Sequence, residues 1–551
     1  QVYPRSFGDS DGDGVGDLRG ITSRLDHLTD LGVDVVWLSP VYRSPMRDNG
    51  YDISDYEDVD PLFGTLDDLA GLVDALHARG MKLVMDLVVN HTSDQHAWFQ
   101  ASRDPRSDQR DWYIWRPARE GFEPGTPGAE PTNWGSFFGG SAWAYDEASG
   151  EYYLHLFAPE QPDLNWENPE VRQAVYAMMN RWVDRGVDGF RMDVINLISK
   201  SYPLQDGAVG PGYAWSREVT RVANGPRLVE FLEEMNEAVG ISARELFTVG
   251  EMVMCDVAQA REYTSQFHPR LVMVFTFEHM MVDQEPGSDK WSLKHLHLPD
   301  LKKNLAAWQE GLADEGWNSL YLENHDQPRS VSRFGDDSPE FRASSAKALA
   351  TVLHMHRGTP YVYQGQELGT TNASFAQLEQ YQDVESLGFA AEATAAGVPL
   401  ERVLTALAAK SRDNARTPMA WSDAPNGGFT TGTPWLPLNG NFREVNVAAQ
   451  SADADSVLAH YRTLIALRHE YETVQSGRFD LLLPEDEKLW VITRTRGSQM
   501  VLAVANMSSE LASVPLAELP DLTHAQLLVG EDTPDIQTLE PWESRVYLLG
   551  S

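Results

Sequence analysis

The chain has 551 residues, which is too many for one ordinary hydrophobic core and indicates two or three domains. Its composition, with 42% hydrophobic and 23% charged residues, is typical of a soluble globular protein. The formal net charge of −38 would repel a phosphate backbone or an anionic lipid surface, so neither a nucleic acid nor a membrane is expected as a partner.

The single cysteine, Cys255, excludes an intrachain disulfide and fits a reducing compartment. No apolar run is as long as a membrane span, and no signal peptide is visible. We therefore expect a cytoplasmic protein that is a monomer or a small homo-oligomer. Because residues 2–7 have the pattern of the middle of a strand, we also expect the natural chain to start before Gln1.

Strands and helices alternate over most of the chain. The first strand is predicted over 2–7 and the second over 33–38, and a helix follows over 66–76, where apolar residues recur at helical spacing. Gly80 ends that helix. The six further predicted strands cover residues 82–88, 187–194, 246–251, 271–277, 318–324 and 359–363. Eight strands alternating with helices indicate a parallel sheet closed into a (β/α)8 barrel.

Two stretches depart from this alternation. Residues 92–165 are rich in Gly, Pro, Trp and Asp and lack helical periodicity, which predicts a small domain inserted after the third strand. Beyond a helix near residue 464, short β-rich runs alternate with turn signals to the end of the chain. The predicted division is a barrel over 1–91 and 166–465, an inserted domain over 92–165, and a C-terminal antiparallel β-sandwich over 466–551.

Polar residues stand at the carboxyl ends of four predicted strands, the end where barrels of this kind carry their active sites. They are His91, the Arg191–Asp193 segment, Glu251, and the pair His325 and Asp326. Any one of them alone would be explained most simply as a structural ion pair or a buried polar group. Four such ends, which a barrel brings to one mouth, predict a catalytic site instead.

The carboxylates in this set suit cleavage of a glycosidic bond, which needs one ionised and one protonated carboxyl group. Arg191 and Asp193 are two residues apart and point to the same face of a strand, so the guanidinium should hold Asp193 ionised. Glu251 follows an apolar run and has no cation next to it in the sequence, so partial burial near another carboxylate should favour its protonated form. Asp326 is a third carboxylate, and His91 and His325 are expected to donate to sugar hydroxyls.

These segments resemble, in order, the four hallmark segments of the α-amylase family of glycoside hydrolases. They are residues 86–91, 189–194, 249–252 and 323–326, and a fifth segment over 161–165 resembles the form found in the oligo-1,6-glucosidase branch. The resemblance implies three domains and retention of configuration. It implies Asp193 as nucleophile, Glu251 as general acid/base and Asp326 as transition-state stabiliser. Arg191 and Gln161 join the two histidines among the expected substrate-binding residues.

Two further segments bear on where the enzyme cuts. In the resembling exo-acting enzymes an aspartate and an arginine clamp the terminal glucose, and we assign these roles to Asp52 and Arg416, with Arg412 as the second candidate. The alternative is a surface salt bridge. Ala420 and Gln366 depart from the family's usual residues and are expected near the pocket rim.

Val194 directly follows the predicted nucleophile. In the resembling enzymes valine at this position accompanies α-1,6 bonds, because a β-branched side chain narrows the space for the second sugar of an α-1,4 pair. The alternative is a core valine without a selective role. The leading hypothesis is an exo-acting α-glucosidase that releases glucose from short isomalto-oligosaccharides, with transglucosylation as a side reaction.

Other functions are weighed against this one. The enzymatic alternatives are an α-1,4-glucosidase (maltase) and a sucrose-active relative. A non-catalytic binding protein, like the amylase-like ectodomains of amino-acid transporter heavy chains, is disfavoured because every catalytic carboxylate is present and no membrane span is visible.

Residues 9–17 have carboxylates at every second position and glycines between them, a pattern typical of a loop that binds a hard cation. The pattern is not an EF-hand, because Gly20 stands where that motif needs a bidentate glutamate. By resemblance, Ca²⁺ is favoured over Mg²⁺ in a structural role, and the alternative is an acidic turn without an ion. The implied ligands are Asp9, Asp11, Asp13, Asp17 and the Val15 carbonyl.

Overall fold

The computed structural model describes residues 1–210, 214–268, 270–373, 375–531 and 537–550. Its centre is a parallel sheet whose strands follow one another in chain order, each separated from the next by helix and loop. These strands are β1 (Val35–Leu38), β4 (Lys82–Val88), β8 (Gly189–Asp193), β9 (Phe247–Glu251) and β10 (Met273–Phe275). Their burial on both faces is typical of parallel strands covered by helices.

The sheet closes into a barrel through three short elements. A bridge between Val274 and Asn318 joins β10 to β11 (Ser319–Leu320), which pairs in parallel with β12 (Thr359–Pro360). The amino group of Gln1 donates to the Val362 carbonyl at 2.6 Å, and the Val2 N–H donates to the Trp37 carbonyl at 2.8 Å. The predicted (β/α)8 barrel is therefore present.

The first barrel position is shorter than predicted. Only Val2 bridges to Leu38, and the remainder of the predicted strand forms helix α1 (Pro4–Phe7). Proline lacks the N–H that a ladder needs, and its fixed φ suits the first turn of a helix, so the strand ends before Pro4.

Helices cover the outside of the barrel. The predicted helix is α4 (Leu66–His77), which begins at a capping box between Thr65 and Asp68. Its buried face carries Leu69, Leu72, Val73 and Leu76. The other helices are α2 (Leu18–Thr22), α3 (Leu25–Leu31), α6 (Pro169–Asp184), α7 (Leu228–Val239), α8 (Val257–Tyr263), α9 (Leu298–Gly311), α10 (Ser330–Phe334), α11 (Arg342–Met355), α12 (Val384–Ala395), α13 (Leu400–Lys410), α14 (Val447–Ser451), α15 (Val457–Glu470) and α16 (Glu472–Ser476).

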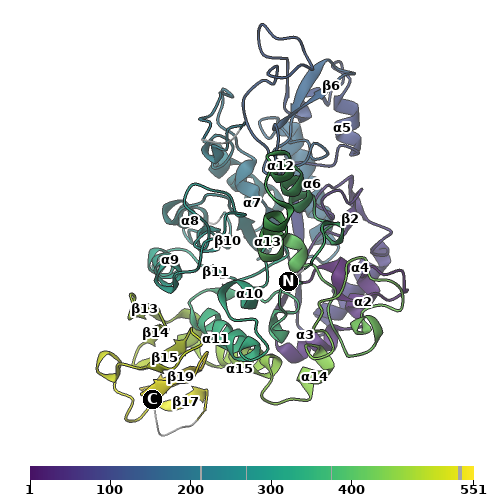
Figure 1. Cartoon of the computed structure of the whole chain (residues 1–551). Coiled ribbons are helices and arrows are strands. Elements are labelled where there is room, and N and C mark those ends of the chain that lie inside the picture. The colour runs from purple at the N-terminus through teal and green to yellow at the C-terminus, as the bar shows by residue number, and fades with distance from the viewer. Residues whose placement is uncertain (211–213, 269, 374, 532–536, 551) are drawn as a thin grey trace.

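The stretch between β4 and α6 stands above the barrel at the top of Figure 1. It contains helix α5 (Ala97–Ser102) and a small antiparallel sheet in the order β5-β7-β6. The strands are β5 (Trp115–Arg116), β6 (Trp143–Asp146) and β7 (Glu151–Leu154). A ribbon of β2 (Tyr42–Arg43) and β3 (Asp55–Val59) precedes α4.

The C-terminal part, at the lower left of Figure 1, is an antiparallel sheet in the order β13-β14-β15-β19-β17. Its strands are β13 (Arg478–Leu482), β14 (Leu489–Arg496), β15 (Gln499–Asn506), β17 (Gln526–Val529) and β19 (Ser544–Leu549), and a second pair is β16 (Ala512–Ser513) with β18 (Thr538–Leu539). Alternate residues of β14 face opposite ways: Trp490 belongs to the main core, whereas Val491 packs with Leu539 of the second pair. The sheet is thus covered on both faces.

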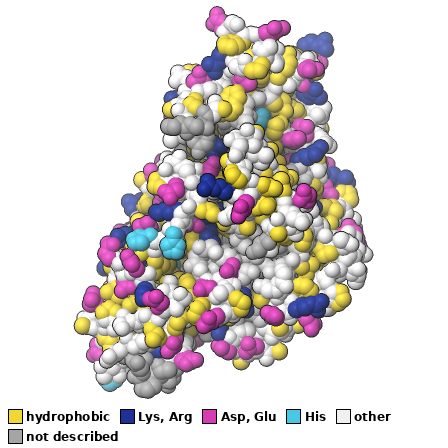
Figure 2. All heavy atoms as spheres, in the orientation of Figure 1, with side chains coloured by type: hydrophobic (Ala, Val, Ile, Leu, Met, Phe, Trp, Pro, Cys, Tyr) yellow, Lys and Arg dark blue, Asp and Glu magenta, His cyan; other side chains and the backbone are white. Residues whose placement is uncertain are grey.

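Acidic side chains are spread over the face seen in Figure 2 and are interspersed with basic ones, so the negative charge is not gathered in one patch there. No helix among the described residues is long and apolar enough to cross a membrane.

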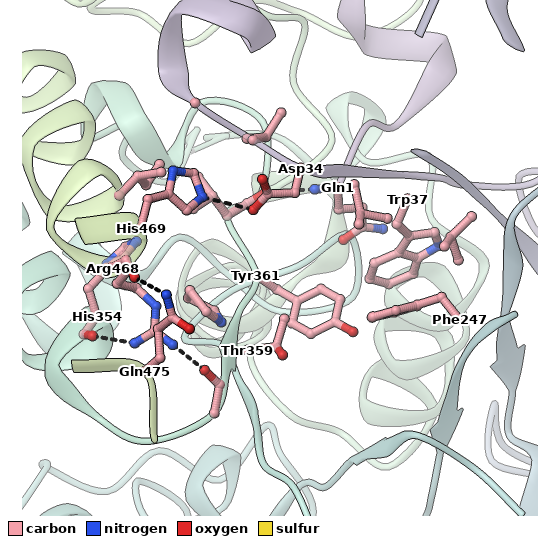
Figure 3. A pocket seen from close by; sticks show the side chains of 18 of the residues that line it. Gln1, Asp34, Trp37, Phe247, His354, Thr359, Tyr361, Arg468, His469 and Gln475 are labelled. Carbon is pink, nitrogen blue, oxygen red and sulfur yellow. Dashed lines mark hydrogen bonds and ion pairs between the residues drawn. The ribbon is translucent and has the colours of Figure 1, made fainter. Parts of the chain in front are cut away.

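A cavity of about 330 Å³ lies at the amino end of the barrel (Figure 3). Its walls include Val35 and Thr359, the first residues of β1 and β12, together with Gln1, Tyr361 and Arg468. None of the predicted catalytic residues lines this cavity.

Candidate active site

A second pocket, of about 250 Å³, opens at the carboxyl ends of the strands. Asp193 and Glu251 are the last residues of β8 and β9, and both line this pocket together with Asp326, which follows β11. Three aromatic side chains from the inserted stretch, Phe137, Phe138 and Phe157, form one wall. The barrel therefore brings the three predicted carboxylates to one mouth, as expected for this architecture.

Arg191 joins two of these carboxyl groups. Its Nη1 donates to Oδ1 of Asp193 at 2.6 Å, and its Nη2 lies 2.6 Å from Oε1 of Glu251. Nη1 also donates to Asp86 at 2.7 Å, and Asp86 accepts a hydrogen bond from Trp37 Nε1 at 2.8 Å. Because all these groups are buried, the guanidinium fixes Asp193 and Glu251 close together, as a double displacement at one carbon requires.

Burial dominates the protonation of the pair. Burial raises the pKa of Glu251 to about 8 and that of Asp193 to about 7, although Arg191 lowers both. The guanidinium is expected from the sequence to hold Asp193 ionised; its attraction does lower this pKa, but loss of hydration outweighs that attraction. Both groups thus titrate near neutral pH as a coupled pair, in which one ionised and one protonated carboxyl group coexist in the site.

Asp326 has the opposite electrostatic environment. Burial tends to raise its pKa, but the combined attraction of His325, Arg412 and Arg416 lowers it far below the ordinary value. The Asp326 carboxylate lies 3.2 Å from Nε2 of His325 and 2.8 Å from Nη2 of Arg416. It therefore stays ionised beside the pocket, where a fixed negative charge can stabilise positive charge that develops on a sugar ring.

The end wall of the pocket differs from the predicted clamp. Asp52 is buried outside the pocket, where its carboxylate accepts hydrogen bonds from Ser44 Oγ and the Arg47 and Asp48 N–H groups at 2.9–3.0 Å. The carboxylate that lines the pocket is Asp48, which lies 2.9 Å from Nη2 of Arg412. Asp52 instead closes the turn that presents Asp48.

The structure also differs from the clamp role predicted for Arg416. It has no exposed surface, and it supports Asp326 and the His325 carbonyl, at 2.9 Å, from behind. Arg412, the second candidate in the sequence, is the arginine that lines the pocket. It contacts Asp48, Asp326 at 3.2 Å, and Asp383 at 2.5 Å.

The remaining predicted sugar-binding residues divide into two groups. His91 lines the pocket, and burial lowers its pKa to about 4, so it is neutral at pH 7. Gln161 does not line the pocket, but its Nε2 donates to Asp48 at 3.1 Å. His325 is also outside the pocket lining, and its Nε2 lies 2.7 Å from the Tyr51 hydroxyl. Gln161 and His325 therefore position Asp48 and Asp326 in this structure.

Val194 lines the pocket with a backbone φ of 35°, a left-handed conformation that β-branched residues rarely adopt. In this conformation its N–H donates to Oε2 of Glu251 at 3.2 Å. Val194 thus contributes its side chain to the pocket lining and its backbone N–H to the acid/base carboxyl group.

Several pocket residues carried no sequence signal. Lys290 and Glu385 form an ion pair at the pocket, and they come from the loop after β10 and from α12. Ala420 and Gln366, which were expected near the rim, do not line the pocket. Gln366 is buried and accepts a hydrogen bond from the Tyr363 N–H at 3.0 Å, so it stabilises the turn after β12.

Away from the pocket, the loop over 9–17 brings Asp9, Asp11 and Asp17 together, with one carboxylate oxygen of each within 4.8 Å of the others. Gly12 and Gly14 have positive φ values, which allow the tight path of this loop. Asp13 is not part of that group, and its Oδ1 accepts a hydrogen bond from the Val15 N–H at 2.8 Å.

Two buried carboxyl groups are held by one arginine, and a third, ionised carboxylate lines the same pocket. This set of groups is the one that a retaining glycoside hydrolase needs. Comparison with known proteins agrees. The sequence model of the protein family described as alpha amylase, catalytic domain, matches residues 1–477. The chain belongs to the α-amylase family of glycoside hydrolases.

Individual relatives match along the whole length. The oligo-1,6-glucosidase of Parageobacillus thermoglucosidasius is 50% identical over 99% of this chain and 97% of the relative, and that of Halalkalibacterium halodurans is 50% identical over 100% and 97%. The crystal structure of trehalose-6-phosphate hydrolase from Bacillus licheniformis superposes with a TM-score of 0.92 at 43% identity, covering 100% of this chain and 98% of that one. The inferred fold and hydrolase class are confirmed.

Proposed function

We propose that the protein is a retaining, exo-acting α-glucosidase that releases glucose from the non-reducing ends of short α-1,6-linked oligosaccharides. The observation that carries this proposal is the pocket that Asp193, Glu251 and Asp326 line together with the ion-paired Asp48 and Arg412. A wall of buried charged groups admits a chain end, offers hydrogen bonds to its terminal hydroxyls, and leaves no passage for a longer chain.

The first half-reaction follows from the two carboxyl groups. The Asp193 carboxylate attacks the anomeric carbon and forms an ester bond while the glycosidic bond breaks. Glu251 gives its proton to the departing oxygen and becomes a carboxylate. The ionised Asp326, held by Arg416, stabilises the positive charge on the ring.

The second half-reaction reverses the roles. The Glu251 carboxylate removes a proton from water, the resulting nucleophile displaces Asp193 at the anomeric carbon, and glucose leaves with its original configuration. A sugar hydroxyl in place of water would give transglucosylation by the same step.

Support for the α-1,6 linkage comes from Val194 on the pocket wall and from the relatives whose names specify that bond. The test is the ratio of initial rates on isomaltose and maltose for the unmodified enzyme and for Val194→Ala. The proposal predicts faster turnover of isomaltose and a shift of about tenfold toward maltose in the variant, since one or two methyl groups select by this amount. A preference for maltose in the unmodified enzyme would identify an α-1,4-glucosidase.

Phosphorylated sugars suit this pocket poorly. Within the described part of the chain, its lysine and arginine side chains are Lys290 and Arg412, and both already contact carboxylates. A phosphate group would meet the negative charges of Asp48, Asp326 and Glu385 without an available cation.

We propose in addition that the loop over 9–17 binds a structural Ca²⁺ ion through Asp9, Asp11 and Asp17. Three carboxylates within reach of one another suit a hard cation, and the Asp13 carboxylate and the Val15 carbonyl belong to the same proposed ligand set. The test is thermal unfolding with EDTA and with added Ca²⁺ or Mg²⁺. The proposal predicts a higher Tm with Ca²⁺ that is lost in Asp11→Asn, and an unchanged Tm would refute it.

For the setting, we propose a cytoplasmic enzyme that acts as a monomer or a small homo-oligomer on small oligosaccharides. Its one cysteine, Cys255, is buried, so the described fold needs no oxidising compartment. Sedimentation equilibrium tests the oligomeric state.

A further inference from the structure

The loop after β10 reaches across to α12 at the mouth of the pocket. Its base is held by Asp283, which is buried and pairs with Arg333 and Lys410. A bridge between Gln284 and Leu293 brings its two arms together, so residues 284–293 form a hairpin-like arm. Near the tip of this arm stand Lys290 and Trp291, and their neighbours on α12 are Glu385 and Phe389.

Lys290 pairs with Glu385, and both residues line the catalytic pocket. Their side chains are 29% and 18% exposed, whereas the Glu251 side chain is 7% exposed, so the pair lies nearer the mouth than the acid/base group. The Glu385 carboxylate also lies 3.6 Å from Nε of Arg412. The ion pair therefore borders the space that the departing sugar must occupy.

Trp291 does not line the pocket, yet it contacts the groups that hold this pair. Its ring stacks on Phe389 with centroids 4.4 Å apart and planes within 11° of parallel. The Lys290 ammonium lies 4.7 Å from the centroid of the same ring. One side chain thus connects the arm to α12 through the stack and supports the cation that meets Glu385.

The apolar contacts of Trp291 attach the arm to a hydrophobic cluster formed by a later part of the chain. Trp291 packs against a cluster that includes Phe375, Ala390 and Leu407. The other members of this cluster in the described chain all come from residues 373–436. Trp291 is therefore the apolar contact by which the arm reaches that cluster.

We propose that Trp291 is a positioning residue for the leaving-group side of the pocket. By stacking on Phe389, it fixes the arm against α12 and holds Lys290 on Glu385 at the mouth. The inference rests on the proposed glucosidase function and adds a residue that selects for a sugar leaving group without touching it.

Two substrates separate this role from the catalytic chemistry. Isomaltose carries a sugar as leaving group, whereas α-glucosyl fluoride carries a single fluorine atom and engages only the glucose end of the pocket. We expect Trp291→Ala to raise KM for isomaltose and to lower its kcat/KM about tenfold, the combined effect of one aromatic stack and one cation–π contact. Hydrolysis of α-glucosyl fluoride should change by less than about twofold, and Trp291→Phe should restore most of the isomaltose activity.

A matched control is Trp317→Ala. The Trp317 ring also has a cation 4.7 Å from its centroid, the guanidinium of Arg357, but it lines the cavity at the other end of the barrel. This variant should lower Tm and leave the ratio of the two kcat/KM values unchanged. In a double-mutant cycle, Trp291→Ala and Phe389→Ala should be less than additive on isomaltose.

The outcomes are distinct. Equal losses on both substrates in Trp291→Ala, or no loss on either, would overturn the positioning role. If the unmodified enzyme cleaves neither isomaltose nor α-glucosyl fluoride, the proposed glucosidase function itself fails.

Discussion

Nη1 of Arg191 lies 2.6 Å from Asp193, and the neighbouring Nη2 lies 2.6 Å from Glu251, so one rigid guanidinium fixes the distance between nucleophile and acid/base. Neither carboxyl group can move toward a substrate without loosening a charged contact in a buried site. The geometry needed for a double displacement is therefore present before the sugar binds.

Replacing Arg191 by lysine tests this arrangement. A lysine has one compact charge and cannot reproduce two hydrogen bonds in fixed directions. We expect Arg191→Lys to lower kcat/KM on isomaltose by roughly a hundredfold or more, as loss of a preorganised donor does elsewhere. Arg181→Lys, at an exposed ion pair with Glu57, is the control and should retain activity. Unchanged activity of Arg191→Lys would show that the bridge is dispensable.

The two raised pKa values set the pH dependence of the rate. Asp193 must be ionised, so activity falls as pH drops through its pKa of about 7, and Glu251 must be protonated, so activity falls as pH rises through its pKa of about 8. We expect a bell-shaped profile of kcat/KM with a maximum between these values, which belong to the coupled pair. A profile without a basic limb would contradict the role of Glu251.

The same burial predicts a pH-dependent effect on stability. The folded pKa of Glu251, about 8, exceeds its ordinary value of 4.5, so the folded state binds the extra proton between these limits. Stability from this group is then lost as pH rises from 4.5 to 8, by on the order of 5 kcal/mol. Relative to the unmodified protein, Glu251→Gln should gain stability in urea as pH rises from 5 to 8. A constant difference would contradict the raised pKa.

Two neighbouring aspartates have different positions: Asp48 lines the pocket, whereas Asp52 lies behind it. Asp48→Asn removes a charge that pairs with Arg412 on the pocket, so we expect kcat/KM on isomaltose to fall at least tenfold, mostly through KM. Asp52→Asn weakens the turn behind it and should lower stability by about 1–2 kcal/mol with a smaller effect on KM. A larger rise in KM for Asp52→Asn than for Asp48→Asn would show that Asp52, and not Asp48, binds the sugar.

What the sequence predicted depended on local patterns. Asp193 and Glu251 were placed correctly at strand ends because strand periodicity and the segments around them are local properties. Asp48 and Asp52 could not be told apart, since the turn they share decides which carboxylate faces the pocket. Pro4 ended the first strand early, although the surrounding residues favoured β-structure.

The rim could not be predicted for a different reason. Lys290 and Glu385 are 95 residues apart, and only the packing of the β10 loop on α12 brings them together. Neither belongs to a motif with a fixed spacing. Long-range contacts between loops leave no local pattern in the sequence, whereas the barrel strands do.

The central claim is that Asp193 forms a covalent bond to glucose while Glu251 acts as acid and base. The most direct measurement is mass spectrometry of peptides after reaction with a 5-fluoro-α-glucosyl fluoride, which slows release of the intermediate. The account predicts one fluoroglucosyl group on the peptide that contains Asp193, and none in Asp193→Asn. A label on Glu251, or no covalent label with an active enzyme, would contradict it.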